Sequence, residues 1–191
     1  VGDGFVTTQY DQTVNARNAV QTTAANQHPI VIGGVLNTVN NRPMPRLDGI
    51  NHFMDIPAPI ALGGISVVLN ALDGAVFGDW DGSVGGQSVV NWTATSSTAN
   101  LRAINAVGTP VINGVSTMNF APLADLKVAV TNSTVTAAEA TGWRIGQDRG
   151  TTTRRWNGNI AEIIAFPALL STADRQTLER NQGAYFNITV A

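Results

Sequence analysis

The sequence contains no cysteine among its 191 residues. Disulfide bridges, thiolate metal sites and a cysteine nucleophile are therefore excluded, and the stability of the fold has to come from packing. Charge is sparse as well, because charged residues make up 13% of the chain, the net charge is -2 and Lys127 is the single lysine. Without a run of Lys and Arg, the chain lacks the basic footprint of a nucleic-acid-binding protein, and we expect no nucleic-acid partner.

Long apolar runs and histidines are scarce too. No apolar stretch approaches the roughly 20 residues that a membrane-spanning helix needs, so we expect no membrane insertion. His28 and His52 are the only histidines, and neither has metal-ligand spacing to a partner, which predicts two isolated surface histidines. No Gly-x-Ser-x-Gly elbow occurs, which argues against a Ser-His-Asp triad.

What the chain does contain is a series of short β-branched runs separated by Gly, Asn and Pro turns. Residues 64–72 (GISVVLNAL) form an apolar run that predicts a central strand, and runs such as IVIGGVLN and LKVAVTN predict further strands in antiparallel hairpins. The spacing favours an all-β sandwich or barrel. At this length we expect one domain that spans residues 1–191.

The C-terminal stretch, residues 154–188, predicts a strand followed by a helix. Residues 158–166 (GNIAEIIAF) predict a strand in a sheet interior. Residues 171–182 predict a helix packed at the edge of that sheet, because Ser171 can cap its N-terminus with Asp174 three residues on. Gly183 is expected to interrupt this helix, after which Tyr185, Phe186 and Ile188 would lay an apolar tail on the fold.

Two segments carry a resemblance to a known family. Residues 156–164 (WNGNIAEII), followed by the Leu-Ser-x-x-Asp-Arg-Gln helix and an aromatic tail, resemble the C-terminal signature of concanavalin A-like (LamG-like) domains of bacterial and phage surface proteins. Residues 5–31 resemble that family's opening segment, although Thr13, Val14 and Ala16 stand where the family has Ser, Gly and Gly. The resemblance implies a two-sheet antiparallel jelly-roll β-sandwich with a short C-terminal helix.

The resemblance also raises the question of catalysis, because an arabinofuranosidase family shares this arrangement. That family uses two carboxylates, for which the candidates here are Asp79 or Asp81 in FGDWDG and Asp148 in IGQDRG. Two carboxylates about 5 to 10 Å apart suffice for glycoside hydrolysis. The matching segment lacks a glutamate, however, and both segments also read as ordinary Gly-Asp turns. We therefore predict a protein that is not an enzyme, with glycosidase activity as a minor alternative.

Four tryptophans stand out in a chain whose aromatic content is only 6%. Trp92 and Trp143 lie in strand-like runs and predict core positions, and Trp156 matches a structural position of the family. Trp80 lies between Asp79 and Asp81, where a sugar could stack on the indole ring while carboxylates bind its hydroxyl groups. The predicted ligand-binding residues are therefore Trp80, Asp79, Asp81 and Asp148.

The residues themselves predict no cofactor and no metal site. Many concanavalin A-like domains hold calcium, so the resemblance implies that Asp3, Asp11 and Asn15 could donate oxygens to a calcium ion. Loop acids at this spacing are more often turn formers. We therefore predict no metal site, with calcium as the alternative.

Two functions follow as hypotheses. The first is a non-catalytic extracellular, cell-surface or virion-surface module that binds a carbohydrate or cell-surface glycan. The alternative is a structural phage virion protein, such as a capsid decoration or a tail or fibre subunit, which contacts copies of itself or lattice neighbours. A neutral Thr- and Asn-rich surface with few lysines would lose little side-chain entropy in such contacts.

Overall fold

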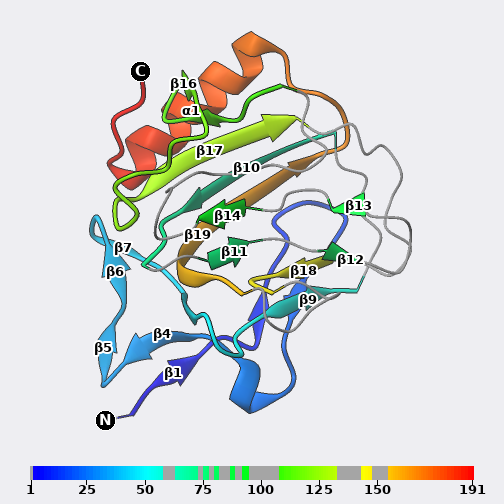
Figure 1. Cartoon of the computed structure of the whole chain (residues 1–191). Coiled ribbons are helices and arrows are strands. Elements are labelled where there is room, and N and C mark those ends of the chain that lie inside the picture. Colours follow the sequence, from blue (N-terminus) through cyan, green and yellow to red (C-terminus); the bar gives the residue numbers. More distant parts are fainter. Residues whose placement is uncertain are drawn as a thin grey trace.

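The computed structural model describes residues 2–57, 63–72, 108–132, 143–147 and 155–191, and the backbone alone of strands at 75–77, 80–81, 87–88 and 92–94. The described chain is all-β apart from a short 3₁₀ turn and one C-terminal helix (Figure 1). All strand pairs among these residues are antiparallel, as predicted.

The strands group into one six-stranded sheet, one four-stranded sheet and several smaller ones. The six-stranded sheet has the order β16-β15-β17-β10-β19-β8 and the four-stranded sheet the order β18-β9-β3-β2. A three-stranded sheet has the order β1-β4-β5, and three hairpin-like pairs are β6-β7, β11-β14 and β12-β13. The element bounds are β1 Gly4–Phe5, β2 Thr8–Gln9, β3 Ala19–Val20, η1 Ala24–Asn26, β4 Pro29–Ile32, β5 Val35–Leu36, β6 Thr38–Val39, β7 Arg42–Pro43, β8 Arg46–Asp48, β9 Met54–Ile56, β10 Gly64–Leu69, β11 Ala75–Phe77, β12 Trp80–Asp81, β13 Gln87–Ser88, β14 Trp92–Ala94, β15 Val111–Ile112, β16 Val115–Ser116, β17 Lys127–Asn132, β18 Trp143–Ile145, β19 Asn157–Phe166 and α1 Thr172–Phe186.

Strand β10 is the centre of the six-stranded sheet. It pairs with β17 on one side and β19 on the other, and every residue from Gly64 to Leu69 is buried. Successive side chains of a strand point to opposite faces, so a strand without an exposed position must be covered on both sides. The predicted central strand is therefore confirmed. The predicted interior position of residues 158–166 is confirmed as well, because β19 lies between β10 and β8 in the sheet.

Two apolar clusters cover the two faces of this sheet. The inner core joins the six-stranded and four-stranded sheets and comprises Ala19, Leu47, Met54, Ile56, Ile65, Val67, Leu69, Ala71, Ile112, Phe120, Ala129, Trp143, Ile145, Trp156 and Ile160. The helix-side core lies on the opposite face and comprises Met44, Val68, Leu126, Val128, Val130 and Phe186. The shared inner core makes the arrangement sandwich-like, and it contains Trp143 and Trp156, as predicted.

The four-stranded sheet shows the expected alternation of buried and solvent-facing residues. Met54 and Ile56 of β9 join the inner core, whereas Asp55 between them is only half-buried. Asp55 accepts two hydrogen bonds from Arg144 of β18, at 2.7 and 3.0 Å. The Arg144 guanidinium also lies 3.9 Å from the ring centre of Phe53, so the outer face is held by an ion pair and a cation–π contact.

The helix begins where the sequence predicts and ends later. Ser171 caps its N-terminus, because the Asp174 N–H donates to the Ser171 hydroxyl oxygen at 3.2 Å. The predicted end at residue 182 is wrong, since α1 continues through Gly183 to Phe186. A Cβ on Gly183 would lie 2.6 Å from the Val190 side chain. Only glycine therefore leaves room for the C-terminal segment to pack against the helix at this position.

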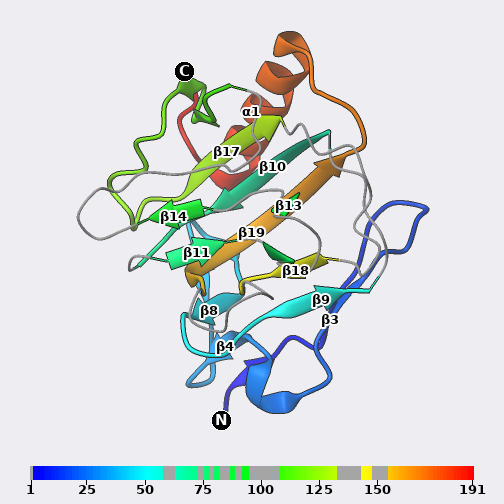
Figure 2. The same cartoon turned by 45° about the vertical axis from the view of Figure 1, so that its right-hand side comes forward.

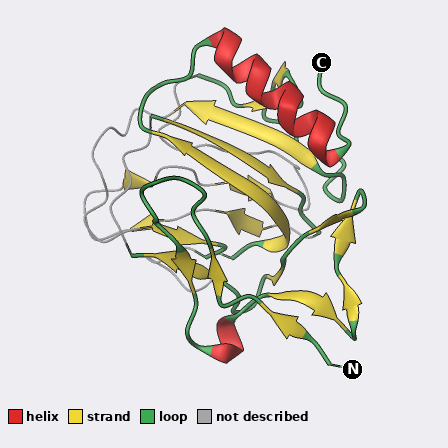
Figure 3. Cartoon of the chain, turned by 180° about the vertical axis from the view of Figure 1, so that it is seen from behind, coloured by secondary structure: helices red, strands yellow, loops and turns green. Residues whose placement is uncertain are grey.

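The helix lies on the face of the six-stranded sheet, which corrects the predicted edge position (Figure 3). Gln182 is buried and reaches two interior strands. It accepts a hydrogen bond from the Ser66 hydroxyl of β10 at 2.6 Å and donates one to Glu162 of β19 at 2.8 Å. Phe186 joins the helix-side core, so the last turn, which was predicted as a tail, supplies the apolar contact.

The β6-β7 hairpin caps the other end of this helix. The last carbonyl groups of a helix have no partner within the helix. Asn40 donates to the Phe186 carbonyl at 3.0 Å, and Arg42 donates to the Tyr185 carbonyl at 2.9 Å. The Arg42 guanidinium also lies 4.2 Å from the Tyr185 ring centre. Residues of the β6-β7 hairpin, early in the chain, thus provide hydrogen-bond donors for the last turn of the C-terminal helix.

A buried amide network joins β10 to β19 and explains the position of Trp156. The Trp156 indole N–H donates to the Asn70 carbonyl at 3.1 Å, and the Asn70 side chain accepts two hydrogen bonds from Asn159, each at 2.9 Å. Asn37 donates to Asn159 at 2.8 Å, and Asn70 donates to the Ala124 carbonyl at 2.8 Å. These bonds satisfy buried polar groups that would otherwise be costly.

Lys127, the single lysine, is buried at the start of β17. Its ammonium group donates to the Pro122 carbonyl at 2.5 Å and to the Asp125 carbonyl at 3.3 Å. It also lies 5.1 Å from the ring centre of Phe120. Burial lowers the pKa of Lys127, while the nearby Asp125 carboxylate opposes that effect.

The tightest packing around the amide network is at Gly158, and it yields a test. A Cβ at this position would lie 2.2 Å from the Asn70 carbonyl oxygen and 2.9 Å from the Trp156 indole nitrogen. We expect Gly158→Ala to lower the free energy of unfolding by about 3 kcal/mol, measured by urea denaturation. Gly2→Ala is the matched control, since a Cβ there meets no atom within 4 Å. Equal stability of the two variants would contradict this packing.

Candidate functional site

Trp80 and Asp81 form strand β12, which pairs with β13 in the register Trp80 to Ser88 and Asp81 to Gln87. The structure describes the backbone of this pair and not its side chains. Asp79 and Asp148 lie outside the described residues, as does the Trp92 side chain. Ligand binding at Trp80, Asp79, Asp81 and Asp148 therefore stays a prediction.

The three oxygen donors considered for calcium already take part in hydrogen bonds, Asp11 and Asn15 within one loop and Asp3 with a distant residue. Asp3 accepts a hydrogen bond from the Gly33 N–H at 2.6 Å. Asp11 accepts from the N–H groups of Arg17 at 2.9 Å and Thr13 at 2.8 Å, and from the Thr13 hydroxyl. These backbone bonds, from Arg17 first, lower the pKa of Asp11. Asn15 donates its side-chain amide to the Thr13 hydroxyl, so Asp11 and Asn15 act as turn formers, whereas Asp3 connects the N-terminus to Gly33.

In the part of the chain that the structure describes, no group of three or more His, Cys, Asp or Glu side chains is arranged to hold a metal ion. No helix there is long and apolar enough to span a bilayer either. Calcium at Asp3, Asp11 or Asn15 therefore stays the alternative that the resemblance implies.

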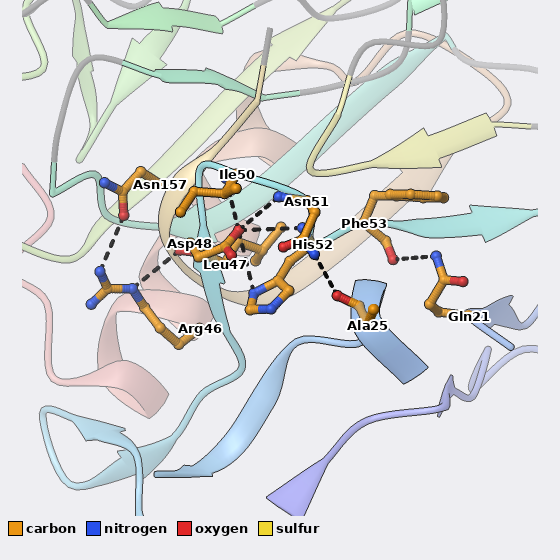
Figure 4. Close-up of polar contacts among 10 residues, drawn as sticks. All are labelled: Gln21, Ala25, Arg46, Leu47, Asp48, Ile50, Asn51, His52, Phe53 and Asn157. Carbon is orange, nitrogen blue, oxygen red and sulfur yellow. Dashed lines mark hydrogen bonds and ion pairs between the residues drawn. The ribbon is translucent and has the colours of Figure 1, made fainter. Parts of the chain in front are cut away.

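The most strongly connected polar group outside the core is Asp48, at the end of β8 (Figure 4). One carboxylate oxygen accepts hydrogen bonds from the N–H groups of Ile50 at 2.8 Å, Asn51 at 3.1 Å and His52 at 3.3 Å. Partial burial raises the pKa of Asp48, but these three bonds outweigh it and the net pKa is lowered. Asp48 therefore stays ionised and fixes the loop between β8 and β9.

The same loop is tied to the N-terminal half of the chain by two amide side chains. Asn51 donates to the Ala25 carbonyl of η1 at 2.6 Å, and Gln21 donates to the Phe53 carbonyl at 3.1 Å (Figure 4). The Phe53 N–H donates in turn to the Asn26 carbonyl at 3.2 Å. The position of the loop is thus determined on both sides.

His52 lies beside Asp48, with its Nδ1 atom 3.5 Å from the Asp48 carboxylate. Burial lowers the pKa of His52, whereas the Asp48 carboxylate and a hydrogen bond to the Arg46 backbone raise it; the Arg46 charge has a smaller lowering effect, and the net pKa is lowered. Arg46 itself donates to the Asn157 side chain at 3.1 Å and so connects this loop to β19 (Figure 4). The loop therefore groups a carboxylate, an imidazole and a guanidinium.

The prediction of two surface histidines is wrong. His28 is only 1% exposed and is among the largest fully buried side chains, and His52 is half-buried. Their separation in sequence concealed their proximity, which is close enough for a charge on His52 to lower the pKa of His28. The Asp48-Gly49 step before Asn51 is a turn signal that could have identified the Asp48 loop.

The described contacts of the two histidines suit positioning. Within the described residues, His28 contacts the Gln9 side chain, at 3.3 Å, and His52 contacts Asp48. A nucleophile with a general base requires a hydroxyl within hydrogen-bond reach of the imidazole, and none of the described hydroxyl groups lies there. Asp48 holds the loop, and the loop holds His52 close to His28.

The Asp48 loop yields a second test. We expect Asp48→Ala to lower the free energy of unfolding at pH 7 by about 1–2 kcal/mol, because three N–H groups lose their acceptor at a partly exposed site. Since the pKa of Asp48 is lowered in the folded protein, this stabilisation is complete above about pH 4 and is lost as the pH falls further. Urea unfolding at pH 7 and pH 2.5, with the fully exposed Val14→Ala as control, measures it. A wild-type advantage undiminished at pH 2.5 would contradict the assignment.

Comparisons with family models, with curated proteins and with solved structures give no match to this chain. The resemblance to concanavalin A-like domains therefore stays a prediction that rests on the two terminal segments.

Proposed function

We propose that the chain is a non-catalytic module of an extracellular, cell or virion surface that acts by assembling with copies of itself. The observation that carries this proposal is the three-stranded sheet β1-β4-β5. Figures 1 and 2 both draw it at the N-terminal end of the molecule, below the six-stranded sheet. Its composition resembles that of a protein core, whereas its side chains lie largely in solvent.

The exposure of this small sheet is unusual for its composition. Its exposed apolar residues are Phe5 (50%), Ile32 (43%), Val35 (70%) and Leu36 (45%). Ile32 pairs with Val35 across the hairpin, so their side chains share one face, and Leu36 lies on the other. Of the residues in these three strands, only Pro29 is buried. Small sheets of this kind need apolar packing on a face to be stable, and a partner would supply it.

A second copy of the chain is the partner that the charge distribution favours. The net charge of -2 gives only weak repulsion between identical chains. Lysine side chains resist immobilisation because of their rotamer entropy, and the single lysine is buried away from the surface. Exposed apolar residues that share one face, as Ile32 and Val35 do, are typical of protein–protein contacts.

The concanavalin A-like jelly roll remains part of this proposal. A six-stranded and a four-stranded antiparallel sheet that share the inner core are compatible with such a sandwich. The fold does not decide the function, because one fold hosts many functions. The surface role therefore rests on the exposed sheet and on the resemblance at the two ends of the chain.

Glycan binding at Trp80 is the second candidate. Strand β12, which carries Trp80 and Asp81, pairs with β13 in a two-stranded unit separate from the larger sheets. Short hairpins of this kind are frequent positions of binding residues. An indole ring flanked by Asp79 and Asp81 has the chemistry to stack on a sugar and bind its hydroxyl groups.

The assembly proposal predicts a specific loss of association. We expect Val35→Lys to weaken self-association by about tenfold or more, equivalent to about 1.4 kcal/mol, because it places a charge in the apolar contact. Folding should be unaffected, since Val35 is 70% exposed. Sedimentation velocity over a concentration series measures the association. Leu169→Lys is the control, because Leu169 is 57% exposed and lies outside the sheet. A wild-type chain that stays monomeric at high concentration would disprove self-assembly.

The glycan candidate makes a separate prediction. We expect Trp80→Ala to abolish binding on a glycan array while the far-UV circular dichroism spectrum is retained, because the stacking surface is lost. Tyr10→Ala, which removes an aromatic ring that is 71% exposed, is the control and should retain binding. Absence of wild-type binding to any glycan would leave assembly as the function. Sugar release from aryl glycosides that is lost in Asp148→Asn would instead identify a glycosidase.

A further inference from the structure

His28 is a buried histidine whose ring is only partly satisfied. Its side chain is 1% exposed, and its Nε2 atom lies 3.3 Å from the Gln9 side-chain amide. Its Nδ1 atom is buried and has no hydrogen-bond partner among the residues that the structure describes. A neutral imidazole donates from one nitrogen and accepts at the other, whereas the protonated ring needs two acceptors. The Gln9 amide turns its nitrogen toward Nε2, so the neutral ring accepts a hydrogen bond there and carries its proton on Nδ1. In the protonated ring Nε2 would also carry a proton and would face that amide N–H, so neither ring N–H would have an acceptor among the described residues.

The N-terminal segment, residues 2–9, is held partly at His28 and partly elsewhere, because β2 pairs with β3, the Gln21 N–H donates to the Thr7 carbonyl and Val6 packs on the inner core. The Val6 N–H donates to the His28 carbonyl at 3.0 Å, and β1 pairs with β4 immediately after His28. Gln9 of β2 supplies the described contact to the His28 ring. None of residues 2–9 is buried, so this segment is held by backbone pairing and few apolar contacts. Segments of this kind open at a lower free energy than the core.

The charged groups around the two histidines are distributed unequally. His52, on the β8-β9 loop, has Asp48 beside it and is also affected by Arg46. His28 feels burial and the charge of His52, and no carboxylate among the described residues acts on it. Gln9, which contacts it from β2, is uncharged. Acid can therefore charge His52 beside a counter-ion, whereas a charge on His28 has none.

We propose that His28 is an acid-sensitive latch, whose protonation releases residues 2–9 from the body of the protein while the sandwich core stays folded. The released segment includes β1, so the three-stranded sheet with its exposed apolar residues loses an edge strand in acid. This opening follows from the contacts of His28 and does not depend on whether the sheet binds a second copy.

The direction and size of the effect follow from linkage. Burial, and then the charge of His52, lowers the pKa of His28 to about 4 in the folded protein from 6.5. The closed state is therefore fully favoured above about pH 6.5 and loses stability as the pH falls toward 4. Between pH 7.5 and pH 5 the opening equilibrium of residues 2–9 should rise by about 25-fold.

Hydrogen–deuterium exchange with peptide resolution, corrected for intrinsic exchange rates, tests the latch on the whole chain. We expect opening of residues 4–9 to rise by about 25-fold between pH 7.5 and pH 5, with no matching rise in β10. His28→Gln keeps a polar partner for Gln9 but cannot be charged, and it should reduce the rise to under about threefold. His52→Gln is the matched control and should retain most of the response, because burial is the larger cause at His28.

Three results would overturn the proposal. These are an unchanged opening of residues 4–9 in the wild type, an equal rise in β10, and the same rise in a folded His28→Gln variant. If that variant does not fold, the ring titration of His28 in the wild type, followed by NMR, decides. A midpoint below about pH 5 supports the latch, and a midpoint near pH 6.5 overturns it.

Discussion

Burial of both faces of β10 is the constraint on which the rest of the structure depends. A strand without any exposed position needs two apolar layers, and this chain supplies them from different parts of its sequence. The four-stranded sheet covers one face, and α1 with its flanking segment covers the other. The helix in turn needs partners for its last carbonyl groups, which Asn40 and Arg42 provide. Residues far apart in sequence are therefore coupled through one strand.

The sequence predicted those elements whose signal is local. The strands predicted at 64–72 and 158–166 and the Ser171 cap have short-range patterns, and all three were found, with the strands at Gly64–Leu69 and Asn157–Phe166. The helix end was mispredicted because Gly183 was taken as a helix breaker. Its absent side chain instead makes room for Val190, a contact that propensity does not contain. The hydrogen bonds of Gln182 with Ser66 and Glu162 were not predicted either, because these residues lie far apart in the sequence.

The histidines show the same limit at the candidate site. Nothing near His28 in the sequence predicts burial, because the residues that enclose it, such as Gln9 and the β8-β9 loop, come from elsewhere in the chain. The Asp48 turn was accessible to sequence reasoning, since Asp before Gly is a turn signal. The effect of this turn on His28 could not be predicted, because it depends on the hydrogen bond between Asn51 and the Ala25 carbonyl of η1, which connects the loop of His52 to the segment before His28. Polar side chains that contact backbone across long separations fix this region.

The buried position of Lys127 has a chemical consequence. Amine-directed reagents attack the unprotonated, solvent-accessible ε-amino group, and the described fold shields the single lysine of the chain behind Phe120, Pro122 and Asp125. Its acylation thus requires that the start of β17 leave the sheet. The extent of acylation at this one side chain, measured by mass spectrometry, would therefore report the opening of the start of β17 without any substitution in the sequence.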